Sequence, residues 1–168
     1  MPKLISRRGD VVQAVDDAFT TVADGESIPT VGDVIVSLAR FQSEGEDLLA
    51  QGRRVGVFLA PDEAPEVLAY DLPRISVIAL IFPKFRDGRP YSTARILRET
   101  LKFSGELRAV GDVLLEQVFF MTRCGFDAFA PADGSQAEDI AVAARRYRHV
   151  YQRAADAMEP AFVRRAGT

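Results

Sequence analysis

Apolar runs of strand length recur along the chain, and most are separated by longer segments in which apolar residues have helical spacing. The runs occupy residues 34–38, 55–60, 75–82, 107–110 and 126–130. Those at 55–60 and 75–82 are almost continuously apolar, which is typical of strands covered on both faces. The alternation predicts one α/β domain of about five mostly parallel strands with crossover helices, arranged as an open sheet or an incomplete barrel.

Capping and breaking residues mark the helices expected between these strands. An amphipathic helix over residues 91–103 is entered through Pro90, and a short helix is expected near residues 65–70. Asp112 is expected to cap an apolar helix over residues 113–124, which Gly125 should end in a left-handed conformation. Both full-length helices fit the connections between parallel strands.

The C-terminal region carries the signature of one long helix. A capping-box pattern at residues 135–138 should open it, and Pro160 should prevent it from continuing much beyond Met158. Its apolar stripe consists of Ile140, Ala143, Tyr147, Val150, Ala154 and Ala157. We expect this stripe to pack on the chain's own sheet, with a coiled-coil dimer as the alternative. Residues 1–30 are expected to form an N-terminal arm or hairpin, and residues 31–168 the domain.

The amino-acid composition excludes several kinds of functional site. The 168 residues are 48% hydrophobic and 27% charged, and include one cysteine, Cys124, and one histidine, His149. An internal disulfide, a multi-histidine metal site and a cysteine set for an iron–sulfur cluster are therefore excluded, and we expect no metal or cofactor. Cys124 should end an apolar helix, where packing is a better interpretation than reactivity. His149 lies among arginines on the expected long helix and is interpreted as a surface or packing residue.

The charge distribution is uneven although the formal net charge is only -3. Acidic residues dominate between positions 9 and 71, whereas residues 84–108 are rich in lysine and arginine. The acidic balance of the whole chain makes nucleic acid an unexpected partner. No apolar run is long enough to cross a bilayer, and residues 1–10 do not resemble a signal peptide, so a cytoplasmic location is expected.

The densest polar cluster follows the run at residues 75–82. Ligands of parallel α/β sheets bind where the carboxyl ends of strands meet the following loops. We expect an anion-accepting surface there for phosphate, sulfate or carboxylate, formed by Lys84, Arg86, Asp87, Arg89, Tyr91, Ser92, Arg95, Arg108 and Asp112. The alternative is an ordinary solvated turn.

Arg108 needs separate treatment because it interrupts an apolar strand. Leu107 and Ala109 should point to one face of the sheet, and Arg108 and Val110 to the other. A buried guanidinium requires a carboxylate partner, and the candidates considered are Asp112, Asp87 and Glu116.

Two long stretches resemble a known family. They are ALIFPKFRDGRPYSTARILR at residues 79–98 and GELRAVGDVLLEQVFFMTRCGFD at residues 105–127. Both are similar to the uncharacterised bacterial domain-of-unknown-function family 934, whose members are encoded beside assimilatory sulfite reductase. The resemblance implies a place in sulfite reduction and names no catalytic residues.

Two functional hypotheses follow from the sequence and the resemblance. The first is an accessory protein of assimilatory sulfite reduction that is not an independent electron carrier, with sulfite reductase or another sulfur-assimilation protein as its partner. The second is a small α/β enzyme, or an oxidoreductase-associated protein, that binds a small anionic metabolite at the strand ends. The sequence sets no oligomeric state.

Overall fold

Four parallel strands in the middle of a sheet account for most of the apolar runs. In the computed structural model, which describes residues 4–166, these strands are β4 (Asp33–Ser37), β5 (Val55–Leu59), β6 (Ile75–Phe82) and β7 (Glu106–Gly111). β6 has the predicted bounds and pairs in parallel with both β5 and β7. The expected mostly parallel sheet is therefore confirmed.

Four further strands raise the total to eight within the described residues, more than the five expected. They are β1 (Leu4–Arg8), β2 (Val11–Val15), β3 (Phe19–Thr21) and β8 (Ala128–Phe129). The strand order is β2-β1-β8-β7-β6-β5-β4-β3, with β1 antiparallel to both neighbours and all other pairs parallel. In the segment expected to form an arm or hairpin, β1 and β2 pair as an antiparallel hairpin. The two edges of the sheet, β2 and β3, both come from this segment.

The sheet is strongly curled, because its two edge strands are joined by only three residues. A flat sheet of eight strands would separate β2 from β3 by roughly 34 Å. The chain from Val15 to Phe19 can span at most about 14 Å. Phe19 on β3 accordingly faces Arg108 on β7, with 5.9 Å between its ring centroid and the guanidinium carbon. The sheet remains open, since β2 and β3 are not paired with each other.

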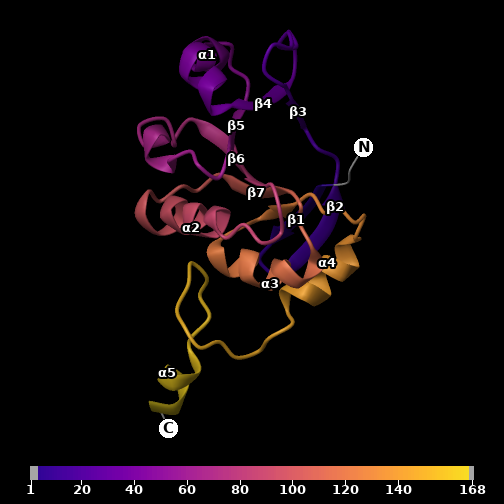
Figure 1. The fold of residues 1–168 in the computed structure, drawn as a ribbon, viewed down its shortest axis with the longest axis vertical. Helices are drawn as coiled ribbons and strands as arrows, with labels where there is room; N and C mark the ends of the chain where they lie inside the picture. The colour runs from indigo at the N-terminus through magenta and orange to yellow at the C-terminus, as the bar shows by residue number, and fades with distance from the viewer. Residues whose placement is uncertain (1–3, 167–168) are drawn as a thin grey trace.

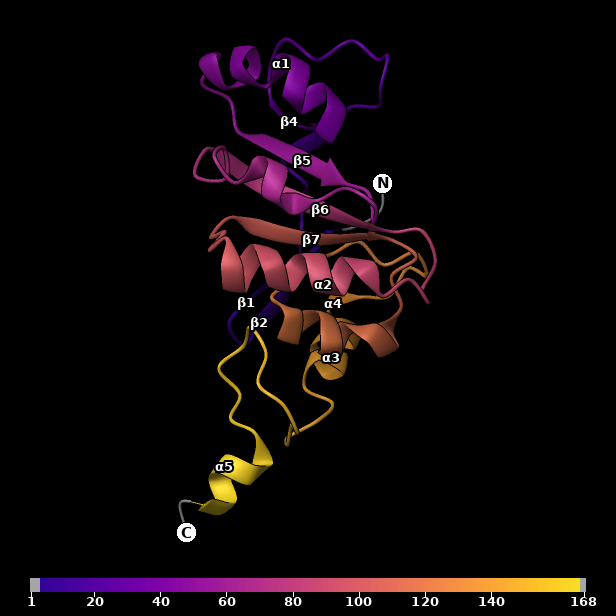
Figure 2. The ribbon, with the colours of Figure 1, turned by 60° about the vertical axis from the view of Figure 1, so that its left-hand side comes forward.

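The helices follow the strands in a regular alternation. They are α1 (Leu38–Ala50), the 3-10 turn η1 (Pro65–Leu68), α2 (Arg89–Arg95) continuing as the π-helical turn η2 (Ile96–Thr100), α3 (Leu115–Cys124), α4 (Ala137–Ala144) and α5 (Ala161–Ala166). Figures 1 and 2 show α1, α2 and α3 along one side of the sheet. The main core lies between these helices and the side chains of Val57, Leu80 and Leu107.

The opposite, concave face carries a smaller apolar cluster. Ile35, Val77 and Ala79 are buried there, and Phe58 and Val110 pack against them while remaining half-buried. Leu107 and Arg108 thus face opposite sides of β7, as their alternation predicts. Within residues 4–166, no helix is both long enough and apolar enough to cross a membrane.

The two ends of α3 differ from each other in how well the sequence predicts them. Gly125 ends the helix with a φ of 99°, as expected of a left-handed C-terminal glycine. Asp112 does not cap its beginning, because the helix starts at Leu115 after Leu114. The Asp112 carboxylate instead accepts a hydrogen bond of 2.8 Å from the backbone nitrogen of Phe85.

The prediction of one long C-terminal helix is wrong. α4 ends at Ala144, and the following chain is irregular until α5, which lies at the far end of the molecule from α1 (Figure 1). Val150 is buried and forms an isolated bridge with Pro160, a pairing that a continuous helix would not allow. The stripe residues beyond this point are alanines, which bury little apolar area, so helical packing gains little there.

Candidate functional site

Two loops meet at the carboxyl edge of the sheet, where the sequence places a site. The backbone nitrogen of Asp112 donates to the carbonyl of Phe82 at 2.8 Å, which joins the end of β7 to the end of β6. The Asp112 carboxylate accepts a hydrogen bond from Phe85 N–H, and Gln117 Nε2 donates one to the Phe85 carbonyl at 2.7 Å. Side chains of the β7–α3 region therefore fix both backbone polar groups of one residue in the β6–α2 loop.

The residues around that fixed point form an exposed basic tip, defined here as Lys84, Phe85 and Arg86. All three are exposed, and Phe85 keeps 41% of its accessible surface. The Arg86 guanidinium lies 5.3 Å from the centroid of the Phe85 ring. Among the described residues, neither Lys84 nor Arg86 has a carboxylate within ion-pair distance. The tip therefore presents an aromatic ring between two cations on a fixed backbone.

Asp87 and Arg89, next along the loop, neutralise each other. Arg89 Nη2 lies 2.6 Å from Asp87 Oδ2, and the Arg89 backbone nitrogen donates to Asp87 Oδ1 at 3.1 Å. These hydrogen bonds lower the pKa of Asp87 and raise that of Arg89. The Asp87 carboxylate thus occupies the start of α2, where the sequence leads us to expect a bound anion.

Arg108 lies away from the tip, in the concave face. It is only 4% exposed, and its guanidinium donates to Asp17 at 2.6 Å and to Glu106 at 2.9 Å. The three partners considered from the sequence are therefore wrong. Glu106 shares a face of β7 with Arg108 and was detectable from the alternation along that strand. Asp17 was not, because it comes from the β2–β3 connection.

The remaining three expected residues are placed along α2. Tyr91 is half-buried, stacks edge-on against Phe82 at 5.2 Å, and has its pKa raised to about 12, mainly by burial. Ser92 is exposed. Arg95 pairs with Glu99 one helical turn further on, at 2.9 Å. The structure brings Lys84, Arg86, Asp87, Arg89 and Asp112 to one loop region and directs Arg108 and Arg95 to other carboxylates.

Gln117 is the residue of this region that sequence reasoning missed. Its side chain is buried, accepts a hydrogen bond from Leu114 N–H at 3.0 Å, and fixes the Phe85 carbonyl. A glutamine inside an otherwise apolar helix was the available signal, since a buried amide needs partners.

Neither Cys124 nor His149 belongs to the basic tip. Burial raises the pKa of the Cys124 thiol, which lies at the end of α3. His149 is exposed in the irregular segment after α4. Within residues 4–166, no group of three or more histidine, cysteine or acidic side chains is placed to hold a metal ion.

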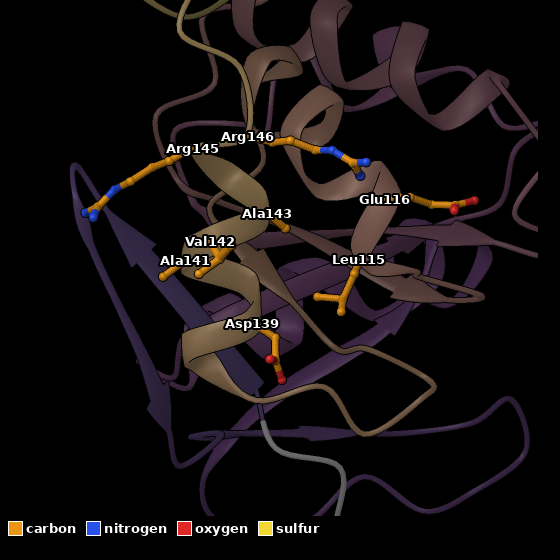
Figure 3. A pocket seen from close by; sticks show the side chains of 8 residues that line it. All are labelled: Leu115, Glu116, Asp139, Ala141, Val142, Ala143, Arg145 and Arg146. Carbon is orange, nitrogen blue, oxygen red and sulfur yellow. The ribbon is translucent and has the colours of Figure 1, made fainter.

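A groove lies away from the basic tip, between α3 and α4. Its volume is about 760 Å³, and Figure 3 shows its lining residues, which include Leu115 and Glu116 from α3 and Asp139, Val142 and Arg146 from the α4 region. It is not formed by any of the nine residues expected from the sequence.

Comparison with family models places residues 56–162 in a family described as "Bacterial protein of unknown function (DUF934)". No curated protein is similar enough to this chain to count as a match. The matched span contains the basic tip, Asp112 and Gln117, as well as both helices that form the groove.

Proposed function

This chain belongs to the DUF934 family, and we propose that it is an accessory protein of assimilatory sulfite reduction that binds a protein partner through the basic tip. In this proposal it does not carry electrons itself. The pathway comes from the resemblance described above, and the mode of action comes from the form of the tip.

The observation that carries the proposal is the exposed ring of Phe85 on a fixed backbone between Lys84 and Arg86. Small-molecule sites are concave and enclose their ligands. The three side chains of the tip are instead exposed, and aromatic and arginine side chains are the residues that contribute most at protein interfaces. Because Asp112 and Gln117 already hold the backbone, little conformational entropy is lost when a partner binds.

The chemistry of the other reactive groups supports an indirect role. The only cysteine is half-buried, and its raised pKa disfavours the thiolate that nucleophilic or redox chemistry requires. The buried guanidinium of Arg108 already donates three hydrogen bonds to the carboxylates of Asp17 and Glu106.

The proposal is tested by measuring binding of the purified assimilatory sulfite reductase of the same bacterium to the full chain. Phe85→Ala and Arg86→Glu should each weaken binding at least about tenfold, the effect expected of an interface anchor. Tyr70→Ala is the matched control, because Tyr70 is 87% exposed and belongs to a different loop. Failure of the parent chain to bind would overturn the proposal, as would normal growth of a deletion strain on sulfate.

An anion-binding function is the second candidate, and the absence of a nearby carboxylate at Lys84 and Arg86 within the described residues favours it. Sulfate, sulfite or phosphate should then raise the melting temperature of the parent chain and have less effect on Arg86→Ala. Arg89→Ala should respond nearly as the parent does, since Asp87 already occupies Arg89. Identical melting with and without all three anions would remove this candidate.

A further inference from the structure

The outer face of the α4 region has a regular charge pattern. Asp139 and Val142 are one turn apart on α4, and Arg146 follows two residues after the helix ends. All three line the groove between α3 and α4. Figure 3 shows Asp139 towards one end, Arg146 towards the other and Val142 between them. Val142 is 75% exposed, although it is the apolar centre of this face.

This face borders the groove between α3 and α4. The middle of the groove is lined by Leu115, Ala141 and Ala143, and charged side chains lie at its ends. Phe120, also on α3, is exposed, and its ring lies edge-on to that of Phe119 with 5.6 Å between the centroids. An apolar groove with exposed flanking residues is the usual form of a surface that another protein covers.

The charges at the two ends of this face indicate which partner it binds. One oxygen of the Asp139 carboxylate accepts a hydrogen bond from Gln136 N–H, which leaves the other for a partner. Arg146 has no carboxylate within ion-pair distance among residues 4–166, whereas Arg145 donates a hydrogen bond to the carbonyl of Asp10. One end of the face therefore lacks a cationic partner and the other an anionic one.

We propose that this face binds the same face of a second copy of the chain across a two-fold axis. If the two α4 helices run antiparallel, Asp139 lies opposite the partner's Arg146 and Arg146 lies opposite the partner's Asp139. Val142 then sits at the axis against the partner's Val142. A pattern of acid, apolar residue and base is its own complement in this arrangement, as a two-fold interface requires. The proposal is independent of any role in sulfite reduction.

Sedimentation equilibrium of the full chain tests the ion pairs. The parent should be a dimer, and Arg146→Glu should raise its dissociation constant at least about tenfold because two acidic groups then face each other twice. The double variant Asp139→Arg/Arg146→Glu should restore association. Arg148→Glu is the matched control, since it reverses the same charge at an exposed position two residues away. A monomeric parent, or a dimer that Arg146→Glu does not weaken, would overturn the proposal.

Disulfide trapping supplies a second test that leaves Asp139 and its hydrogen bond from Gln136 N–H unchanged. In a Cys124→Ala background, Val142→Cys should form a covalent dimer under mild oxidation, because a residue at a two-fold axis meets its own copy within disulfide range. Val67→Cys, at a position 51% exposed on η1, should remain monomeric under the same conditions. No covalent dimer from Val142→Cys, or equal trapping at both positions, would contradict the two-fold arrangement.

Discussion

Arg98, in η2, joins the loop before β7 to the loop after α3. Its Nε donates to the carbonyl of Gly125 at 3.0 Å, and its Nη1 donates to the carbonyls of Phe103 and Gly105 at 2.6 and 2.9 Å. Its Nη2 pairs with Asp127. Only the forked, planar guanidinium reaches all four acceptors, because lysine offers its donors from a single nitrogen.

Arg98→Lys should therefore destabilise the fold although it keeps the charge. We expect a loss of about 2–4 kcal/mol in the free energy of unfolding, since several charge-assisted hydrogen bonds to partly buried carbonyls are lost. Arg95→Lys on the same helix is the control, and its exposed pair with Glu99 should be worth less than about 1 kcal/mol. Urea unfolding measures both, and equal effects would contradict the role given to Arg98.

The Cys124 thiol should be unreactive in the folded chain. Its pKa lies above the ordinary value because burial penalises the thiolate, so the raised pKa lowers the thiolate fraction at pH 8. The stability that this shift contributes is fully present below the unfolded pKa and is lost as the pH rises through the higher folded pKa.

Iodoacetamide labelling followed by mass spectrometry checks this expectation. At pH 8 the folded chain should be alkylated at least about tenfold more slowly than the chain in urea, with the rate rising as the pH increases further. Similar rates for the two states at pH 8 would show that burial does not protect the thiol.

The turns after α3 and before α4 use glycine for different reasons. Both Gly125 and Gly134 have positive φ angles, 99° and 76°. A Cβ atom at Gly125 would lie 2.5 Å from Arg98 Cγ, whereas one at Gly134 would have nothing within 4 Å. The end of α3 thus needs glycine for both its backbone conformation and its close contact.

The two positions give a matched pair of variants. Gly134→Ala should cost about 1 kcal/mol, the strain of a left-handed alanine. Gly125→Ala should cost about 3 kcal/mol, because it adds the displacement of Arg98 to the same strain. Thermal unfolding distinguishes the two values. Equal losses would show that Arg98 moves aside without cost.

The features that were predicted correctly depend on residues close together in the sequence or on the parallel topology. Those that were missed depend on contacts between distant residues. β6 and the left-handed end at Gly125 depend on local residues and were predicted. The meeting of the β6–α2 loop with Asp112 followed from parallel topology, and the structure places them together. The long helix failed because tertiary pairing of Val150 with Pro160 overrides a local pattern. The contact between Arg108 and Asp17 joins distant segments, so no local pattern indicates it.

At the scale of the whole molecule, the curl of the sheet is held by contacts across its concave face. Arg108 on β7 binds Asp17, in the three-residue connection between the two edge strands. The ring of Phe19 lies between Arg108 and Arg54, 5.9 and 5.0 Å from their guanidinium carbons. The middle of the sheet and its edges are thereby joined on the side without helices.

Arg108→Ala should destabilise the molecule by about 3 kcal/mol, because it leaves Asp17 and Glu106 close together without their shared cation. Arg54→Ala is the control on the other side of Phe19. Its exposed pair with Asp33 should be worth less than about 1 kcal/mol. In a double-mutant cycle with Asp17→Ala, Arg108→Ala should show a coupling of about 1–3 kcal/mol. Additive losses in denaturant unfolding would mean that this ion pair does not hold the curl.

The position of β1 also determines the order in which the sheet can be completed during synthesis. Ile5 pairs with Phe129 and Ser6 with Ala128, so β1 leaves the ribosome long before its inner neighbour β8. Until then the edge of β1 that faces β8 is unpaired, and it is the kind of edge at which nascent chains associate wrongly. Arg7 and Arg8 lie on that strand, and their charge protects an edge that must wait for its partner.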